Sequence, residues 1–226
     1  VTGTTGHLAS VSAAANALRL SPAAATYAFG IAATQGADQR AVNGRDHQTL
    51  HPGKAAMDGV LAALLAESGF TSSDRAIEGE RGLLNAVSPE PNPDWLTDHL
   101  NSEWFVRENG HKLYPTASLT HGAIEAAIKI ARRPASDDIV AVEVRMHPFA
   151  ATVTATAQPR NAAEARFSTP HCVAVALRTG ELLPADLNDN AIASSDISAL
   201  RARVSLVSDE AMDKRGCRLA VTLKTG

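Results

Sequence analysis

The chain has 226 residues, enough for one large domain or two small ones, and its net charge of −3 lacks the basic excess of a nucleic-acid-binding protein. Its two cysteines, Cys172 and Cys217, exclude a disulfide framework, a four-cysteine zinc site and an iron–sulfur cluster held by this chain alone, so we expect reduced thiols and a cytoplasmic location. The longest apolar run, residues 22–33, is too short to cross a bilayer, so we expect no membrane partner and no nucleic-acid partner.

The first part of the chain is predicted to be helical because it is rich in alanine, the strongest helix former. A Gly/Thr loop is expected over residues 2–6, and Ser21 followed by Pro22 is typical of an N-cap and the first helical position. Polar residues 37–52 predict a long surface loop, and Gly69 is expected to end the helix after it. The expected helices of this part are residues 8–20, 22–35 and 54–68.

The second part of the chain adds strands to helices. Residues 139–146 alternate so that Val140, Val142 and Val144 share one face, which is typical of a half-buried strand. The other elements expected here are helices over residues 118–132, 162–177 and 196–201 and strands over residues 204–207 and 218–223. Helices and strands in this order favour an α+β domain.

A proline-rich stretch separates the two parts. Three prolines fall within residues 88–93, where no helix can continue. We therefore predict a mixed fold class, with an alanine-rich all-α part over residues 1–90 followed by a smaller α+β domain over residues 91–226.

One cluster of basic residues lies around residues 45–54. His51 and Gly53 belong to a predicted turn, and Lys54 opens the helix that follows it. A helix N-terminus beside a cation is a natural binding site for a carboxylate group. The alternative is a solvated polar loop before an ordinary helix start.

A second cluster pairs Lys112 with His121. Lys112 precedes a turn, and His121 falls about one turn into the next predicted helix, so that both side chains could reach one pocket. Lysine supplies positive charge or, with a lowered pKa, a base, and histidine exchanges protons near neutral pH. The alternative is an exposed lysine and a structural histidine. His171 and Cys172 lack further ligands at suitable spacing, so we expect no bound metal.

Taken together, several segments resemble the MmgE/PrpD family, which includes 2-methylcitrate dehydratases, cis-aconitate decarboxylases and iminodisuccinate epimerases. The order and rough spacing of these segments are kept along nearly the whole chain. The matching segments are residues 2–6, 29–36, 50–56, 59–60, 69–70, 78–79, 112–115, 120–124, 164–168 and 221–224.

The resemblance implies a helical domain joined to an α+β lid, an active site in the cleft between them, no cofactor, small di- or tricarboxylate substrates and a homodimer. By position, Lys112 and His121 match catalytic residues of the family, and His51 matches the histidine of its Leu-His-x-Gly turn. Gln48 stands where the family usually has a lysine, and we place it with His51, Gly53 and Lys54 among the substrate-binding residues. The resemblance also leads us to expect an internal piece of a longer family member.

The function expected from this resemblance is a lyase reaction, most simply the dehydration of a small hydroxy tricarboxylate such as 2-methylcitrate. Such chemistry needs a base beside the carboxylate, cations for the developing negative charge and an acid for the leaving hydroxyl. Lys112 would serve as cation or base, His121 as proton donor or carboxylate ligand, and the His51 turn as carboxylate clamp. An epimerase, a decarboxylase and an inactive truncated family member stay open as alternatives.

Overall fold

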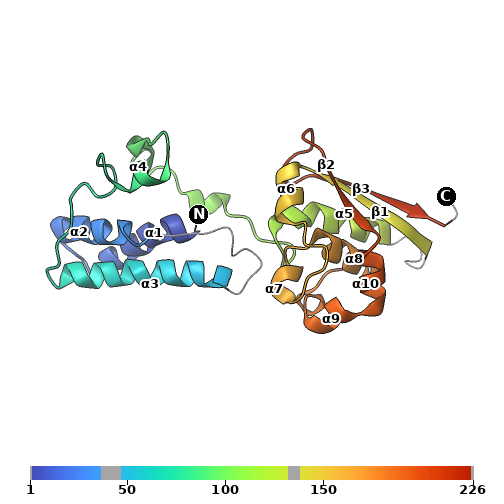
Figure 1. Cartoon of the computed structure of the whole chain (residues 1–226). Coiled ribbons are helices and arrows are strands. Elements are labelled where there is room, and N and C mark those ends of the chain that lie inside the picture. Colours follow the sequence, from blue (N-terminus) through green and yellow to red (C-terminus); the bar gives the residue numbers. More distant parts are fainter. Residues whose placement is uncertain (1, 37–46, 132–137, 225–226) are drawn as a thin grey trace. The chain divides into compact units, whose positions relative to one another are not determined.

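The computed structural model describes residues 2–36, 47–131 and 138–224, and it divides into two units, Val1–Asn109 and Gly110–Gly226 (Figure 1). The described residues before Ser88 contain helices and no strand, whereas the second unit combines helices with a sheet of three strands. The predicted fold class, an alanine-rich all-α part followed by an α+β part, is confirmed.

Three helices form the body of the first unit: α1 (Thr2–Ala17), α2 (Pro22–Ala33) and α3 (His47–Glu67). Figure 1 shows α3 running alongside α1 and α2. Alanine side chains make up most of their shared core, so the helix axes can approach closely. The buried hydrophobic residues of this core are Val11, Ala28, Ile31, Ala32, Ala62, Ala63 and Ala66.

The ends of these helices follow their capping residues in part. Ser21 caps α2 by accepting a hydrogen bond from the amide of Ala24, as predicted, and Gly69 adopts a positive φ of 88° just after α3. The Gly/Thr stretch predicted as a loop is instead the first turn and a half of α1. Gly6 explains this difference, because a Cβ there would lie 3.1 Å from the Cβ of Ala55, so the missing side chain lets α1 pack against α3.

Gly59 marks the closest approach of α3 to α1. A Cβ at this position would lie 2.4 Å from the Cβ of Ser10 and 2.5 Å from the backbone nitrogen of Val11. We therefore expect Gly59→Ala to lower the free energy of unfolding by about 1–3 kcal/mol, because the backbone of α1 must move to admit the methyl group.

Gly53 on the same helix supplies the matched control, because a Cβ there meets no atom within 4 Å. Gly53→Ala should stabilise the chain by about 0.5–1 kcal/mol, the usual gain from alanine inside a helix. Urea unfolding of both variants checks the pair of expectations. Equal effects of the two substitutions would contradict the close contact at Gly59.

The segment that follows α3 and extends to Asn109 contains little regular secondary structure. It contains α4 (Leu83–Val87) and the 3₁₀ turns η2 (Pro93–Leu96) and η3 (Phe105–Glu108), and residues 92–113 are all exposed. The division between units falls after Asn109, further along than the boundary expected after residue 90. The prolines end α4 as expected, but the described residues from there to Asn109 fold only into local turns.

The second unit is built on a sheet with the strand order β2-β1-β3. The central strand β1 (Ile139–Met146) pairs in parallel with β2 (Val204–Ser208) and antiparallel with β3 (Cys217–Leu223). Helices α5 (His121–Ala131) and α8 (Thr169–Thr179) pack against it and share its hydrophobic core.

The alternation predicted for β1 holds at Val142 and Val144 but not at Val140. Val142 and Val144 are fully buried, whereas Val140 is half exposed and Ile139 is buried in its place. The pairing of β1 with β3 shifts register between Ile139 and Ala141, and this irregularity turns Val140 away from the core.

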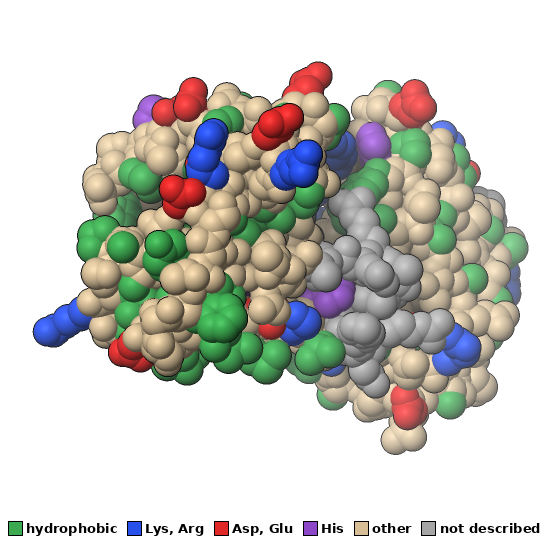
Figure 2. Space-filling view, turned by 60° about the vertical axis from the view of Figure 1, so that its left-hand side comes forward, with side chains coloured by type: hydrophobic (Ala, Val, Ile, Leu, Met, Phe, Trp, Pro, Cys, Tyr) green, Lys and Arg blue, Asp and Glu red, His purple; other side chains and the backbone are tan. Residues whose placement is uncertain are grey.

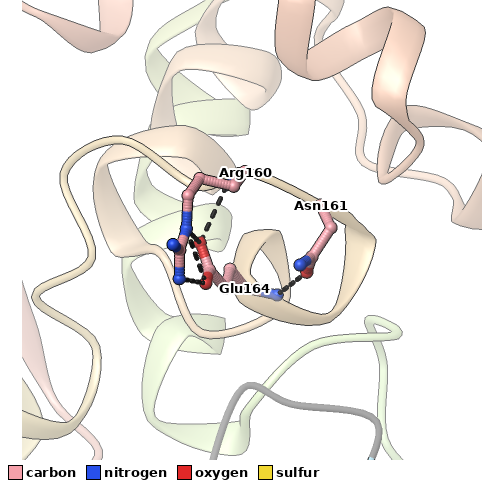
Figure 3. Close-up of polar contacts among 3 residues, drawn as sticks. All are labelled: Arg160, Asn161 and Glu164. Carbon is pink, nitrogen blue, oxygen red and sulfur yellow. Dashed lines mark hydrogen bonds and ion pairs between the residues drawn. The ribbon is translucent and has the colours of Figure 1, made fainter.

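The helix predicted over residues 162–177 is two helices, α7 (Ala162–Ala165) and α8. Glu164 is almost fully buried, and its carboxylate accepts hydrogen bonds from the backbone amide of Arg160, at 2.9 Å, and from the Arg160 guanidinium, at 2.6 Å (Figure 3). The Asn161 side chain caps α7 at the Glu164 amide, and Ser168 caps α8 in turn. Two separate caps therefore divide the segment.

The rest of the second unit consists of short helices and turns. Gly180 ends α8 with a φ of 78°, in the left-handed region that favours glycine. The remaining elements are η4 (Ser118–Thr120), α6 (Pro148–Val153), η6 (Pro184–Asp186), α9 (Asp189–Ala193) and α10 (Ser195–Arg201).

Three histidines, of which His7 and His171 are fully buried and His121 is partly buried, should make the stability of the chain depend on pH. Burial is the main cause that lowers the pKa values of His7, His121 and His171 below the ordinary 6.5, and the Arg201 cation lowers that of His171 further. Below pH 6.5 the unfolded chain binds protons that the folded chain does not. The stability contribution is therefore complete above this pH and is lost as the pH falls toward the folded-state pKa values.

Urea unfolding at about pH 7.5 and about pH 5.5 measures this dependence. We expect a smaller free energy of unfolding at the lower pH, and a weaker pH dependence in His171→Gln, which cannot take up the proton. An equal free energy of unfolding at the two pH values would contradict the expectation.

Candidate functional site

Lys112 and His121 meet at one short turn of the second unit. The Lys112 side chain is exposed and bends back, so that its Nζ donates a hydrogen bond to the carbonyl of Thr116 at 3.2 Å. His121 is the first residue of α5. The Lys112 cation acts on the His121 ring and lowers its pKa, so the two groups lie within electrostatic reach of each other.

Two threonines hold the turn that joins these residues. The hydroxyl groups of Thr116 and Thr120 lie 2.8 Å apart and are buried, and the Thr120 hydroxyl also donates to the carbonyl of Ala117 at 2.8 Å. These hydrogen bonds hold both ends of the turn. They fix the Thr116 carbonyl, which accepts from Lys112, and the start of α5, which carries His121.

The surroundings of His121 favour the uncharged imidazole. Its Nε2 atom is buried and has no hydrogen-bond partner among the described residues. Burial is the largest influence and lowers the pKa, while backbone hydrogen bonding at Thr116 and Tyr114 and the charge of Glu125 act in the opposite direction. The result is a neutral ring near pH 7, which can accept a proton.

Tyr114 and Glu125 flank His121 and were not among the predicted site residues. The rings of Tyr114 and His121 meet edge to face, with centroids 5.4 Å apart and planes at 88°. The Tyr114 hydroxyl donates to the Glu125 carboxylate at 2.7 Å. One sequence signal was available, because Glu125 stands four residues after His121 and so lies on the same side of α5.

The cluster around His51 lies in the first unit, inside α3. This helix begins at His47, so His51 and Gly53 belong to its second turn. The predicted turn before the helix is therefore wrong. Pro52 lies within the helix, where it removes one backbone donor. Gln48 belongs to the first turn, and its side chain lies outside the part of the chain that the structure describes.

Lys54 is engaged by a carboxylate of its own helix. Its Nζ lies 2.5 Å from Oδ2 of Asp58, a residue with only 3% of its surface exposed. His7 on α1 lies within reach of the same charges, because Asp58 raises its pKa and Lys54 lowers it. The ring of His7 is fully buried. Lys54 therefore neutralises a buried carboxylate, a role that was not predicted from the sequence.

Comparison with known proteins covers both units. The family model of the MmgE/PrpD N-terminal domain matches residues 1–96, and that of the MmgE/PrpD C-terminal domain matches residues 114–226. The chain belongs to the MmgE/PrpD family. A curated relative, the cis-aconitate decarboxylase-like protein oryM of Aspergillus oryzae (strain ATCC 42149 / RIB 40), is 26% identical over 230 residues, which cover 93% of this chain and 48% of the relative. The chain thus spans about half the length of this relative.

The two clusters belong to the two MmgE/PrpD domains. His51, Gly53 and Lys54 lie in the unit matched by the N-terminal domain, and Lys112 and His121 lie in the other unit, Lys112 just before the C-terminal match. Within the second unit the structure brings Lys112 and His121 to one turn. The predicted meeting of both clusters in one cleft stays a prediction, because it concerns the placement of one unit against the other.

The described part of this MmgE/PrpD chain offers no cluster of three or more His, Cys, Asp or Glu side chains that could hold a metal ion. His171 forms a hydrogen bond with Arg201, whose guanidinium lies 3.3 Å from the His171 Nδ1. Burial raises the pKa of the Cys172 thiol to about 12, so it stays protonated and is a poor ligand. No helix within the described ranges is both long and apolar enough to cross a membrane.

Proposed function

We propose that this MmgE/PrpD chain takes part in a cofactor-independent lyase reaction on a small hydroxy tricarboxylate, with the dehydration of 2-methylcitrate as the reference reaction. Family membership supports the reaction class, and the turn shared by Lys112 and His121 is the observation that carries the proposal. A fixed cation and a neutral imidazole side by side are the pair that proton removal next to a carboxylate requires.

The proposed roles follow from charge and burial. His121 accepts the proton from the carbon beside a substrate carboxylate, because its ring is neutral and Nε2 has no partner among the described residues. Lys112 has an exposed ammonium group beside this ring and stabilises the negative charge that develops on the substrate. The proton on His121 is then available for the leaving hydroxyl.

The first unit supplies the proposed binding residues for the other carboxylates. His51, Gln48 and Gly53 keep this role in the proposal. Gln48 stands in the first turn of α3, where the helix dipole favours an anion, and His51 and Gly53 follow in the second turn. Lys54 keeps a smaller share of it, because its ammonium group is already paired with Asp58.

Decarboxylation of cis-aconitate is the second candidate. The printed name of the Aspergillus oryzae relative favours it, and loss of carbon dioxide creates the same kind of carbanion beside a carboxylate. The same cation would then stabilise the carbanion, and the imidazole, after taking up a proton from water, would pass it to the carbanion.

A turnover assay with the purified chain tests the proposal. The chain is incubated separately with 2-methylcitrate and with cis-aconitate, and the products are followed by chromatography and by release of carbon dioxide. Formation of 2-methyl-cis-aconitate supports dehydration, and carbon dioxide from cis-aconitate supports decarboxylation. Absence of both turnover and binding for both compounds would overturn the proposal and favour an inactive family member.

We also propose that the protein is a cytoplasmic homodimer. Large apolar side chains lie exposed along one face of α3, and Figure 2 shows hydrophobic side chains gathered along the lower edge of the helical unit. An exposed apolar stripe of this kind is typical of a surface that another protein surface covers. The residues that form the stripe are Leu50, Met57, Val60, Leu61 and Leu64.

The stripe leads to a direct expectation about association. Leu61→Glu and Leu64→Glu should each shift the chain toward the monomer in sedimentation equilibrium, because a charge in an apolar interface loses its hydration. Glu67→Gln, at the end of the same helix, serves as the control. An unchanged molecular mass in both leucine variants would contradict a dimer through α3.

A further inference from the structure

The geometry around α5 points to Tyr114 and Glu125 as positioning residues, which hold the imidazole of His121 in the orientation that proton transfer requires. This inference rests on the proposed function, in which His121 accepts the substrate proton.

Glu125 reaches His121 through Tyr114. The two helical residues are four positions apart and lie on the same side of α5, yet the Glu125 carboxylate accepts its hydrogen bond from the Tyr114 hydroxyl at 2.7 Å. The Tyr114 ring then meets the imidazole edge to face, at a centroid distance of 5.4 Å. Tyr114 is therefore held at its hydroxyl end by Glu125 and presents its ring to His121.

The hydroxyl of Tyr114 keeps its proton throughout the neutral pH range. Burial, together with the hydrogen bond to Glu125 and its charge, raises the pKa of Tyr114 to about 12. Tyrosine is thus always the donor and Glu125 always the acceptor, so the direction of this hydrogen bond is fixed. A fixed hydrogen bond restrains the tyrosine ring and, through it, the plane of the imidazole.

The restraint adds to the backbone hydrogen bonding at Thr116 and Tyr114, which also acts on the His121 ring. Nε2 of His121 has no hydrogen-bond partner among the described residues. Charged groups act on the ring from both sides, Lys112 from the turn and Glu125 from the helix. A tilt of the ring would move Nε2 away from the position that proton transfer requires, so the orientation of the ring bears on kcat more than on substrate binding.

Four variants separate positioning from charge. Glu125→Gln keeps an acceptor for Tyr114 but removes the charge, and Glu125→Leu removes both. Tyr114→Phe keeps the ring contact and removes the hydrogen bond. Glu143→Gln is the matched control, because Glu143 is a carboxylate of the same unit whose partner is Arg145 on β1. Thermal unfolding of each variant verifies that it is folded.

The readout is the ring ¹H–¹⁵N NMR spectrum of His121 in the 226-residue chain, recorded across a pH titration. We expect Glu125→Gln to lower the pKa of His121, since the carboxylate raises it, while the ring signals keep their tautomer pattern. Tyr114→Phe and Glu125→Leu should change the ring signals themselves, and Glu143→Gln should change neither. The inference would be overturned if the His121 ring signals of Tyr114→Phe and Glu125→Leu coincided with those of the unchanged chain.

Turnover gives the second readout. Tyr114→Phe and Glu125→Leu should lower kcat roughly 10- to 100-fold with little change in KM, the usual range for residues that orient a functional group, and Glu125→Gln should retain more activity than Glu125→Leu. An equal kcat in all four variants would contradict positioning. Failure of the proposed function would show separately, as absence of turnover by the unchanged chain, while the NMR signals still decide whether Tyr114 and Glu125 hold the ring.

Discussion

Lys112→Ala and His121→Ala should each reduce turnover of a tricarboxylate substrate by about 10²- to 10³-fold. This loss corresponds to about 3–4 kcal/mol in the activation barrier, the usual contribution of one preorganised electrostatic group. This expectation follows from the proposed roles, in which the ammonium of Lys112 and the neutral ring of His121 act on the same developing charge from one turn. Steady-state kinetics with 2-methylcitrate and with cis-aconitate measures the effect.

The controls are residues of the same types outside this turn. Lys224→Ala removes a lysine paired with Asp138 at the far end of β3, and His99→Ala removes an exposed histidine of the first unit. Both variants should retain the parent rate. If Lys112→Ala and His121→Ala also turned over substrate at the rate of the unchanged chain, the assignment of these residues to the site would be wrong.

Lys54→Ala should destabilise the first unit by roughly 2–3 kcal/mol, because it leaves the carboxylate of Asp58 buried without its partner. Removing one member of a buried ion pair is costly, and the partial exposure of the Lys54 side chain, 44%, places the expected loss below that of a fully buried pair. Asp58→Ala should cost less, since the lysine it leaves behind can turn into water. Urea unfolding measures both losses.

A double-mutant cycle distinguishes this structural role from substrate binding. The variant with both Lys54→Ala and Asp58→Ala should be about as stable as Asp58→Ala alone. Lys129→Ala is the matched control, because Lys129 and Glu125 form an exposed pair at 3.9 Å with the same spacing in a helix, and its loss should stay below about 0.5 kcal/mol. If Lys54→Ala weakened carboxylate binding without loss of stability, the role assigned to the pair would be wrong.

Local patterns were enough to predict the main elements of the fold. Capping at Ser21, the helix end at Gly69 and the strand alternation near Val142 each depend on neighbouring residues, and the structure agrees with all three. The helical Gly/Thr stretch and the register shift beside Val140 depend on contacts with distant segments. No local rule contains this information, because tertiary packing overrides propensity at such positions.

The candidate site likewise contains features that could be predicted from the sequence and features that depend on tertiary contacts. Lys112 and His121 were found from residue type and family resemblance, and the structure adds that they share the turn at Thr116. The predicted turn at His51 is wrong in form, because α3 extends through Pro52 to His47. The engagement of Lys54 by Asp58 follows from the burial of Asp58, which the sequence pattern did not reveal.

The most direct test of the central claim is a titration of the ¹⁵N-labelled chain with 2-methylcitrate and cis-aconitate, followed through the ring signals of His121 and the side-chain ammonium signal of Lys112. We expect both sets of signals to move and saturate together with one of these compounds, and the His121 response to be lost in Lys112→Ala. Signals of Lys112 and His121 that stay unchanged at saturating concentrations of both compounds would contradict it.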